Sequence, residues 1–389
     1  MAHSRPKGGR STRLVAAGRG KDITAPFVNP PVVHASTVLF DSIAEMYSGE
    51  AKYAYGRRGT PTIAALEEAI ADLEGADGTI LCPSGLNAIS TALLAFASTG
   101  DHILLPDSIY EPGRFFADNV LTRLGVEATY YDPSIAGDIA ELIGGNTKVV
   151  YVESPGSITM EMQDIPSIAA AAHARGAMVV ADNTWATPIH SRPLQLGADV
   201  AVLSATKYVG GHSDLMMGAA SANGEAYRAL KQFHGASGLC VAPDDVFLAL
   251  RGLRTIEIRL SRHEESALMV AQWLSARPEV ARVLHPGLDD DPGHPLWLRD
   301  MSGSSGLFSF VLRGGTEKDA AAVLDALEIF GLGYSWGGFE SLAIIGSHGL
   351  TRSLSSVDAE GPIIRLHIGL EDSDDLIADL EQALRHFDP

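Results

Sequence analysis

The sequence predicts an α/β fold in which a mostly parallel sheet is flanked by helices and a smaller α/β domain follows at the C-terminus. Short β-rich segments alternate with helical ones from about Leu66 onward, which indicates right-handed crossovers between buried parallel strands. The length points the same way, because 389 residues exceed what one hydrophobic core commonly serves. A hydrophobic fraction of 46% supplies the apolar side chains that such cores need.

The first part of the chain carries the strands of the predicted sheet. Apolar and β-branched runs predict strands at residues 79–82, 102–105, 126–131, 148–153, 177–181 and 199–204. Apolar residues at helical spacing predict helices at 86–96, 115–124, 139–143 and 165–175. Ligands of such sheets bind at the carboxyl ends of the strands, so the loops that follow these strands are the expected position of a site.

The pattern changes in the second part of the chain. One long helix is expected at 244–272, because few helix breakers apart from Gly252 interrupt it. A second α/β pattern follows, with strands at 306–312 and 363–370 and helices at 318–327 and 376–384. With a boundary near Gly252, the expected units are an irregular N-terminal arm, a first α/β domain and a C-terminal α/β domain, at residues 1–60, 61–252 and 253–389.

Charge and cysteine content exclude several classes of protein. The formal net charge of −19 argues against nucleic acid or an anionic membrane as a partner, because both require a basic surface. Two cysteines, Cys82 and Cys240, make no disulfide scaffold and suit a reducing cytoplasm. No apolar run reaches the length of a membrane span, and the basic residues 1–21 lack the apolar stretch of a secretory signal. We therefore expect a cytoplasmic protein whose basic N-terminus is a solvated arm or an organelle-targeting peptide.

Lys207 is the first candidate for catalysis, in Ser204-Ala205-Thr206-Lys207 directly after a predicted strand. A lysine that follows a buried strand is costly to desolvate, so its pKa falls and the neutral amine needed by an imine-forming nucleophile becomes available. The flanking hydroxyls of Ser204 and Thr206 are suited to a phosphate, and the glycines that follow Val209 allow close backbone approach. The alternative is an ordinary lysine in an exposed loop.

Asp182 follows the predicted strand at 177–181. A carboxylate there is able to hold a protonated heteroaromatic nitrogen, the partner that a pyridinium ring requires to accept electrons. The alternative is an aspartate that caps a helix or forms a turn. Because Asp182 and Lys207 follow consecutive strands of one predicted parallel sheet, together they indicate such a site more strongly than either does alone.

A phosphate site is indicated separately at the start of the helix 86–96. Ser84 is the expected N-cap, and Gly85 lets the backbone approach a ligand closely. The first-turn N–H groups and the positive end of the helix dipole favour an anion, although simple capping explains the same residues. Tyr110, soon after the predicted strand 102–105, is able to stack on a planar ring or to pack in the core.

These residues resemble the Cys/Met-metabolism family of pyridoxal-5′-phosphate (PLP) enzymes, which has the PLP-dependent transferase fold typified by aspartate aminotransferase. The resemblance extends from about Tyr53 to the C-terminus. It implies that Lys207 binds the cofactor PLP covalently, that Asp182 contacts the pyridine nitrogen and that Tyr110 stacks on the ring. The cofactor-binding residues that it implies are Tyr55, Arg57, Gly85, Leu86, Tyr110, Asp182, Thr184, Ser204, Thr206 and Lys207.

The resemblance also implies a homodimer as the functional unit, usually paired into a homotetramer. Tyr55 and Arg57, in Tyr-Gly-Arg-Arg-Gly-Thr, would reach the phosphate of a neighbouring subunit. The arm of residues 1–60 would thereby contribute to the neighbouring active site. Tyr55 and Tyr110 would join Lys207 in catalysis, because they would orient the substrate or tune its amine.

Substrate binding is expected in the C-terminal domain. Strand alternation in Ile-Ile-Arg-Leu-His places Arg365 and His367 on one face and the aliphatic residues Ile364 and Leu366 on the other. A guanidinium within such a strand needs an anion, either a structural carboxylate or the α-carboxylate of a substrate, and the resemblance supports the second. Ser335 and Trp336, in Tyr-Ser-Trp-Gly-Gly-Phe-Glu-Ser-Leu, resemble a segment of the bacterial cystathionine β-lyases of this family and would line the carboxylate region.

The activity that the resemblance implies is α,β-elimination of L-cystathionine to homocysteine, pyruvate and ammonia. Other reactions of the family stay open, namely γ-elimination, γ-replacement and cleavage of cystine or methionine-like substrates. Ser204-x-x-Lys207 also matches the Ser-x-x-Lys pattern of serine acyl enzymes, but the partner tripeptides Ser-Asp-Asn and Lys-Thr-Gly are missing. No metal is expected, because His263-Glu264 lacks the second histidine of a zinc helix and no Cys-x-x-Cys pair occurs.

Overall fold

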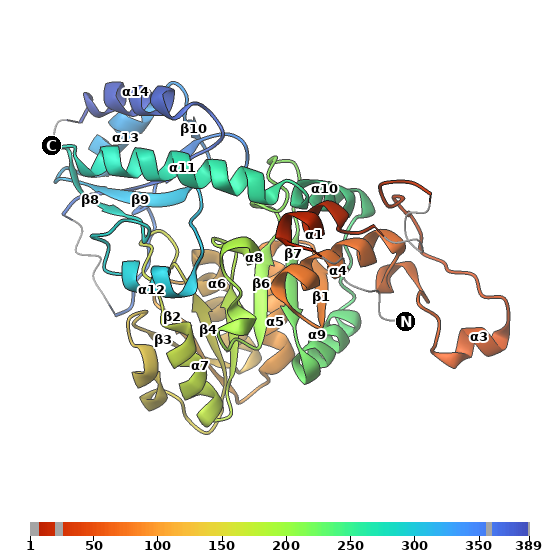
Figure 1. Cartoon of the computed structure of the whole chain (residues 1–389). Coiled ribbons are helices and arrows are strands. Elements are labelled where there is room, and N and C mark those ends of the chain that lie inside the picture. Colours follow the sequence, from red (N-terminus) through yellow and green to blue (C-terminus); the bar gives the residue numbers. More distant parts are fainter. Residues whose placement is uncertain (1–7, 20–25, 355–359, 388–389) are drawn as a thin grey trace.

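The computed structural model describes residues 8–19, 26–354 and 360–387. Strands in these ranges build two sheets, each with helices packed against it (Figure 1). Parts of the predicted N-terminal arm, residues 1–60, and of its basic stretch, residues 1–21, lie outside the described residues. Within the described ranges, no helix combines the length and the apolar character that a membrane crossing requires.

The first sheet has seven strands in the order β1-β7-β6-β5-β4-β2-β3. All neighbouring pairs are parallel except those of β7, which runs antiparallel to both β1 and β6. The prediction of a mostly parallel sheet is therefore confirmed, although the sequence patterns did not locate β7. The strands are β1 (Gly78–Cys82), β2 (His102–Pro106), β3 (Glu127–Tyr131), β4 (Thr147–Glu153), β5 (Met178–Asp182), β6 (Val200–Ser204) and β7 (Gly218–Ala222).

Helices cover both faces of this sheet, as its side chains require. In β4, Val149 and Tyr151 pack in the apolar cluster of α5, whereas Val150 and Val152 pack in the cluster of α7. A strand buried on both sides reads as a continuous apolar run, which is why the sequence pattern locates these strands well. The helices of this part are α4 (Pro61–Glu74), α5 (Gly85–Phe96), α6 (Glu111–Phe116), α7 (Ile165–Ala174), α8 (Thr187–His190), α9 (Gly224–Ala236) and α10 (Pro243–Leu253).

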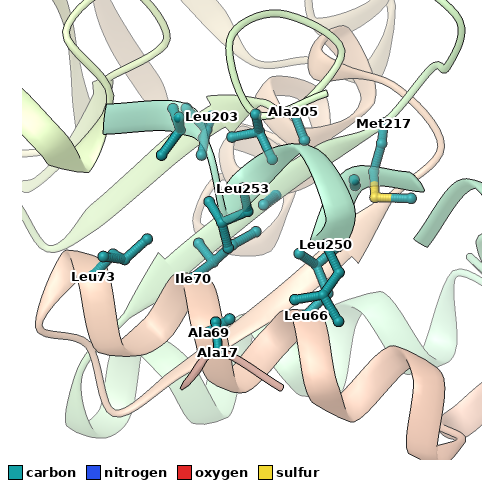
Figure 2. Packing of buried hydrophobic residues seen from close by; sticks show 14 of the residues in the cluster. Ala17, Leu66, Ala69, Ile70, Leu73, Leu203, Ala205, Met217, Leu250 and Leu253 are labelled. Carbon is teal, nitrogen blue, oxygen red and sulfur yellow. The ribbon is translucent and has the colours of Figure 1, made fainter. Parts of the chain in front are cut away.

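Another apolar cluster, between α4 and α10, holds the chain close to Lys207 (Figure 2). Leu66 and Ile70 of α4 lie against Leu250 of α10, and all three are almost fully buried. Burial of each such side chain contributes about 1.5–3 kcal/mol to folding. Ala205, two residues before Lys207, is buried in the same cluster. The backbone that leads to Lys207 is therefore anchored by core packing.

The second sheet has five strands in the order β10-β11-β12-β9-β8. Its central strand β12 is antiparallel to both of its neighbours, and helices α11, α13 and α14 share one apolar cluster with it. The strands are β8 (Val280–Leu284), β9 (Leu307–Leu312), β10 (Gly331–Leu332), β11 (Leu342–Ile345) and β12 (Ile363–His367). The helices are α11 (Ile256–Ser275), α12 (His294–Asp300), α13 (Glu317–Asp325) and α14 (Ser373–Leu384).

The long helix expected at 244–272 is in fact two helices, α10 and α11. Thr255, with φ −112° and ψ 7°, lies between them outside the helical conformation. The cause is tertiary, because a Cβ on Gly252 would lie 2.2 Å from the carbonyl oxygen of Val209, so α10 ends against the loop after Lys207. Arg259 fixes the break, since its Nη2 donates to the carbonyl of Gly252 at 2.8 Å. The predicted domain boundary falls within α10, and the division into three units remains a prediction.

Two other predicted helices differ from the structure. Only part of the expected helix 115–124 is α-helical, because α6 ends at Phe116 and a π-helical turn (Ala117–Leu121) and a 3-10 turn (Thr122–Leu124) continue it. The segment expected as a helix at 139–143 is a 3-10 helix, Ala136–Glu141. Both segments are short, so tertiary contacts decide their form more than local propensity does.

Among its described residues, the N-terminal segment contains the short helices α1 (Arg10–Ala16) and α3 (Ile43–Ser48). Leu14 anchors α1 in the cluster of α4 and α10, but α3 buries none of its residues. Figure 1 shows α3 at the end of an arm that projects from the rest of the chain. The arm continues into the 3-10 turn η1 (Gly56–Arg58) before α4 begins.

Candidate active site

Lys207 lies in the loop after β6, at the carboxyl end of the first sheet. Its Nζ donates a hydrogen bond to Oγ of Ser335 at 2.7 Å and lies 5.1 Å from the ring centroid of Trp336. Burial lowers the pKa of Lys207 to about 8, and the nearby charge of Arg365 acts in the same direction. The predicted depression of the lysine pKa is confirmed, and its cause is desolvation as expected.

Asp182 is the last residue of β5, the strand that neighbours β6 in parallel. Its Oδ1 accepts a hydrogen bond from the amide of Thr184 at 2.8 Å, and its Oδ2 accepts one from the hydroxyl of Tyr151 at 3.1 Å. Burial raises the pKa of Asp182 although both bonds act against this. As expected, Asp182 and Lys207 follow adjacent strands and lie at the same end of the sheet.

The start of α5 meets the end of β6 at close range. Ser84 is the N-cap of α5, and its Oγ accepts a hydrogen bond from the amide of Asn87 at 3.1 Å, so the predicted cap is confirmed. A Cβ on Gly85 would lie 2.6 Å from Oγ of Ser204, so only glycine allows this approach. The first turn of α5, which includes Leu86, therefore presents its N–H groups beside a serine hydroxyl, an arrangement suited to phosphate.

Two threonines near this point have defined partners. Oγ1 of Thr184 accepts a hydrogen bond from the amide of Ser204 at 2.9 Å, so it joins the ends of β5 and β6. Oγ1 of Thr206 is shared with the main chain of Met217, from whose amide it accepts at 2.9 Å. Thr184 and Thr206 therefore shape the loops of the site through their hydroxyls.

Tyr110 is the N-cap of α6, after β2, and its side chain is 42% exposed. Its amide donates to Oε2 of Glu153 at 2.8 Å. Burial raises the pKa of Tyr110, the carboxyls of Glu153 and Asp182 add to this, and Arg365 opposes it. Tyr110 therefore lies within electrostatic reach of both the cofactor-side acid Asp182 and the predicted carboxylate binder Arg365.

Glu153, at the end of β4, is a site residue that the sequence reasoning missed. It is the register partner of Asp182, so two carboxyls lie at the ends of adjacent parallel strands. Burial and the neighbouring Asp182 raise the pKa of Glu153 well above its ordinary value. A signal was present in the sequence, because Glu153 ends a predicted strand in the same way as Asp182 does.

Arg365 lies in the centre of β12, on the face toward Ser335. Its Nη2 donates to the carbonyl oxygen of Ser335 at 3.1 Å, and burial lowers its pKa to about 10. In the described part of the chain Arg365 forms no ion pair, so its charge is open to an anionic ligand. Ser335 has φ +87°, which is unusual for a residue other than glycine, and Lys207 and Arg365 both donate to it.

His367 contacts the loop that carries Ser335 and Trp336. The amide of Gly337 lies 3.1 Å from Nε2 of His367, in hydrogen-bond geometry. Trp336 and His367 both contact the ring of Tyr208, the residue after Lys207, with centroid distances of 5.5 and 5.9 Å. The structure thus brings the predicted substrate-binding residues Ser335, Trp336 and Arg365 together beside Lys207.

Tyr55 and Arg57 lie away from Lys207 in the same chain. Tyr55 precedes η1 and is 47% exposed, and Nη1 of Arg57 donates to the carbonyl of Gly235 in α9 at 2.9 Å. Their predicted contact with the phosphate in a neighbouring subunit concerns a second chain and remains a prediction.

The residues at the strand ends fit PLP. They comprise a buried amine with a depressed pKa, a buried carboxyl for a basic ring nitrogen, and helix-start N–H groups beside Ser204 for a phosphate. The close approach of Gly85 to Ser204 leaves no room for a side chain at position 85, as a phosphate-binding turn requires. No group of three or more potential metal ligands occurs among the residues that the structure describes.

Comparisons with known proteins identify the family of the chain. The model of the family described as Cys/Met metabolism PLP-dependent enzyme matches residues 11–385. A putative cystathionine beta-lyase of Rhizobium johnstonii is 54% identical over 378 residues, which cover 96% of this chain and 95% of that protein. The cystathionine beta-lyase MetC of Escherichia coli (strain K12) is 44% identical over 381 residues, which cover 95% of this chain and 96% of that protein.

A solved structure with the same fold carries the name of a different enzyme from the two relatives above. It is cystathionine gamma synthase of Xanthomonas oryzae pv. oryzae, in complex with aminoacrylate and cysteine, with a TM-score of 0.91 and 33% identity. The alignment covers 98% of this chain and 99% of that one. The predicted fold, that of the PLP-dependent transferases, is confirmed, and the fold alone does not select the reaction.

Proposed function

The chain belongs to the Cys/Met metabolism PLP-dependent enzymes, and from this membership we propose that it is a cystathionine β-lyase of methionine biosynthesis. The Cβ–S bond of L-cystathionine breaks and sulfur leaves as the thiol of homocysteine, while the remaining fragment takes up water and yields pyruvate and ammonia. Relatives named cystathionine beta-lyase, at 54% and 44% identity, support this reaction, and one contact in the structure supports the site. Ser335 accepts hydrogen bonds from both Lys207 and Arg365, which joins the catalytic amine to the expected binder of an α-carboxylate.

The residues that would hold PLP come from four strand ends. Lys207 would bind it covalently, Asp182 would face its ring nitrogen and Tyr110 would stack on its ring. The start of α5 with Gly85 and Leu86, and the hydroxyls of Ser204 and Thr206, would surround the phosphate, while Thr184 would contribute to cofactor binding beside Asp182. When bound, PLP supplies an electron sink for the negative charge that develops at the substrate Cα.

Lys207 moves the proton in this proposal. Because its pKa is lowered to about 8, about a tenth of the amine is neutral at pH 7, far more than for an ordinary lysine, and is able to take the Cα proton at Nζ. Oγ of Ser335, 2.7 Å away, limits the positions that Nζ occupies. The same Nζ then donates a proton to the departing sulfur, which is the reason that one lysine serves both steps.

Arg365 and Trp336 select and orient the substrate. Arg365 lies in the centre of β12, and its guanidinium has no carboxylate partner among the described residues. The planar guanidinium binds the α-carboxylate of the substrate through two parallel N–H groups. The ring centroid of Trp336 lies 5.1 Å from Nζ of Lys207, where the ring would limit the access of water to the amine. A drier environment favours the neutral amine and therefore supports proton abstraction.

The proposal includes an oligomer in which the arm serves a neighbouring copy. Leu39, Ile43 and Tyr47 expose 90%, 68% and 76% of their surface on the projecting arm, and apolar side chains so presented favour a covering partner. A homodimer unit, paired into a homotetramer, would bring Tyr55 and Arg57 to the phosphate of the next subunit, where Tyr55 also orients the substrate. The net charge of −19 and the two cysteines suit a cytoplasmic location.

The test is product analysis with the purified, PLP-loaded protein. Incubation with L-cystathionine is expected to release homocysteine and pyruvate in equal amounts. Formation of 2-oxobutyrate with cysteine would instead identify γ-elimination and overturn the proposal. Sedimentation of the same sample tests the oligomer, and a monomer at working concentration would contradict the shared site.

A further inference from the structure

A buried ion pair brackets Tyr110. Asp107 follows β2, Arg114 lies in α6, and the two residues are 3 positions before and 4 after Tyr110. Nη2 of Arg114 donates to Oδ1 of Asp107 at 2.6 Å. The side chain of Arg114 is 4% exposed and that of Asp107 is 1% exposed. The guanidinium carbon also lies 3.7 Å from the ring centroid of Tyr130. The pair therefore stiffens the turn on which Tyr110 is carried.

The same pair binds a segment of the C-terminal domain, about 240 residues away in sequence. Oδ1 of Asp107 accepts a hydrogen bond from the amide of Ser353 at 2.8 Å, and Oδ2 accepts one from the amide of Leu354 at 3.0 Å. Nη1 of Arg114 donates to Oγ of Ser353 at 2.9 Å. Two charged side chains of one domain thus hold main-chain and side-chain groups of the other.

The segment held in this way, residues 346–354, begins beside the expected substrate binder. The amide of Gly346 donates to the carbonyl of Ile363 at 2.7 Å, and a Cβ on Gly346 would lie 3.6 Å from the Cβ of Arg365. The backbone of residues 346–354 therefore runs from the flank of Arg365 to the turn of Tyr110. The position of residues 346–354 therefore depends on the contacts at both ends of this segment.

A further contact, made by Arg352, holds the same end of this segment against the first part of the chain. Nη2 of Arg352 donates to Oγ1 of Thr159 and lies 3.4 Å from Oε1 of Glu161. The side chains of Arg352 and Glu161 are 5% and 37% exposed, so the contact is partly buried. The segment is thus fastened at residues 352, 353 and 354, and both Asp107 and Arg114 are fully committed to it.

The charge state of Asp107 suits this role. Burial acts to raise its pKa, but the amides of Ser353 and Leu354 and the guanidinium of Arg114 outweigh it, so the pKa of Asp107 lies below its ordinary value. The carboxylate is therefore ionised at neutral pH and accepts all of these bonds at once. A buried carboxylate with this many donors holds its neighbours more firmly than a neutral group does.

We propose that Asp107 and Arg114 are positioning residues that fasten residues 346–354 of the C-terminal domain to the turn of Tyr110, and thereby set the spacing between Tyr110 and Arg365. The fastening itself stands on the hydrogen bonds alone. Its consequence for catalysis rests on the proposed function, because the spacing matters when a substrate carboxylate binds Arg365 while Tyr110 lies over the ring. Neither residue touches the substrate in this account.

The first test measures the fastening in the PLP-loaded protein without substrate. Hydrogen–deuterium exchange is followed in peptides that contain Ser353 and Leu354, for the unsubstituted protein and for Asp107→Asn. Exchange of these amides is expected to be at least about tenfold faster in D107N, because the amide side chain loses an acceptor and the charge. Unchanged exchange would overturn the proposal. Asp138→Asn, at an exposed position of the same domain, is the matched control.

The second test measures the consequence for the reaction. KM for L-cystathionine is expected to rise about tenfold in D107N while kcat changes by less than about threefold, since the reacting groups are intact. Ser353→Ala removes one bond from the C-terminal side and leaves the Asp107–Arg114 pair in place, so it tests the idea if D107N folds poorly; about a threefold rise in KM is expected. Faster exchange with an unchanged KM would overturn the positioning role.

The two proposals fail in different ways. If the unsubstituted protein formed no pyruvate from cystathionine, the proposed function would fail, whereas the exchange result would still decide whether the fastening exists. If turnover occurs but D107N exchanges and binds like the unsubstituted protein, the fastening alone is wrong.

Discussion

The proposed cofactor side of the site, with Asp182 and Lys207, and its proposed substrate side, with Ser335 and Arg365, are held in different ways. Asp182 and Lys207 follow neighbouring parallel strands, whose ladder hydrogen bonds fix the strand ends. Ser335, in contrast, lies in a loop at φ +87° and is held by individual bonds from Lys207 and Arg365. The cofactor side is therefore rigid through its secondary structure, whereas the substrate side depends on a few side chains. Substitutions on the two sides should change different measured quantities.

The largest effect is expected from Lys207→Ala, which removes the reactive group from the rigid side. Pyruvate formation should fall by at least about 1,000-fold, because the variant loses both the covalent link and the proton carrier. The visible absorption of bound PLP should also change, whereas Lys148→Ala, at an exposed position of β4, should resemble the unsubstituted protein. An active K207A protein with unaltered absorption would contradict the whole account of the site.

Arg365→Ala tests the substrate side. KM for cystathionine should rise about 10- to 100-fold, because hydrogen bonds to a charged group contribute about 1.5–3 kcal/mol. Affinity for PLP, measured by equilibrium dialysis, should stay within about threefold, since the strand ends are untouched. Arg282→Ala, an exposed arginine in β8 of the same sheet, is the control. A loss of PLP affinity equal to the change in KM would end the distinction between the two sides.

The pKa of Lys207 tests the two sides together, because burial of its amine between them lowers this pKa. In the apoprotein the neutral amine captures PLP, so the capture rate should rise with pH through a midpoint near the lowered pKa of about 8. An exposed lysine would give a midpoint near about 10.4. Stopped-flow absorbance after mixing apoprotein with PLP, across about pH 6 to 10, measures this. A midpoint near the value of an exposed lysine would show that the site does not desolvate the amine.

A smaller effect is expected for Glu153→Gln, on the rigid side. Burial and Asp182 raise the pKa of Glu153, so its contribution to stability is present below the unfolded pKa of about 4.3 and is lost as pH rises through the folded pKa. Glutamine does not ionise but still accepts from the amide of Tyr110. The apoprotein variant should therefore lose less stability between about pH 5 and 8, by at most about 1.4 kcal/mol per pH unit.

Thermal unfolding of the apoprotein at several pH values measures this difference. Glu141→Gln, at an exposed position of the same domain, serves as the control and should follow the unsubstituted protein. Parallel curves for E153Q and the unsubstituted protein would mean that Glu153 is ionised in the fold. The inference that burial beside Asp182 keeps Glu153 protonated would then be wrong.

Much of the first sheet was predictable, because strands buried on both faces read as continuous apolar runs. Asp182 at the end of β5 and Lys207 in the loop after β6 therefore lie at the same end of the sheet, as the sequence predicted. The antiparallel strand β7 was not predicted, since Gly-Ala-Ala-Ser-Ala carries little β propensity and becomes a strand through pairing with β1 and β6. The break between α10 and α11 was missed because the cause lies in the packing of Gly252 on Val209.

The sequence by itself determined the α/β class, the lysine and aspartate at adjacent strand ends and the arginine within a strand, because strand periodicity and residue chemistry are local properties. Only the tertiary structure decided that Ser335 accepts from both Lys207 and Arg365. It also decided that Glu153 lies opposite Asp182, and that Asp107 accepts from the amide of Ser353. Each of these contacts links residues that are far apart in sequence. No local pattern encodes which distant side chains meet, because that depends on how strands pair and how distant segments of the chain pack against each other.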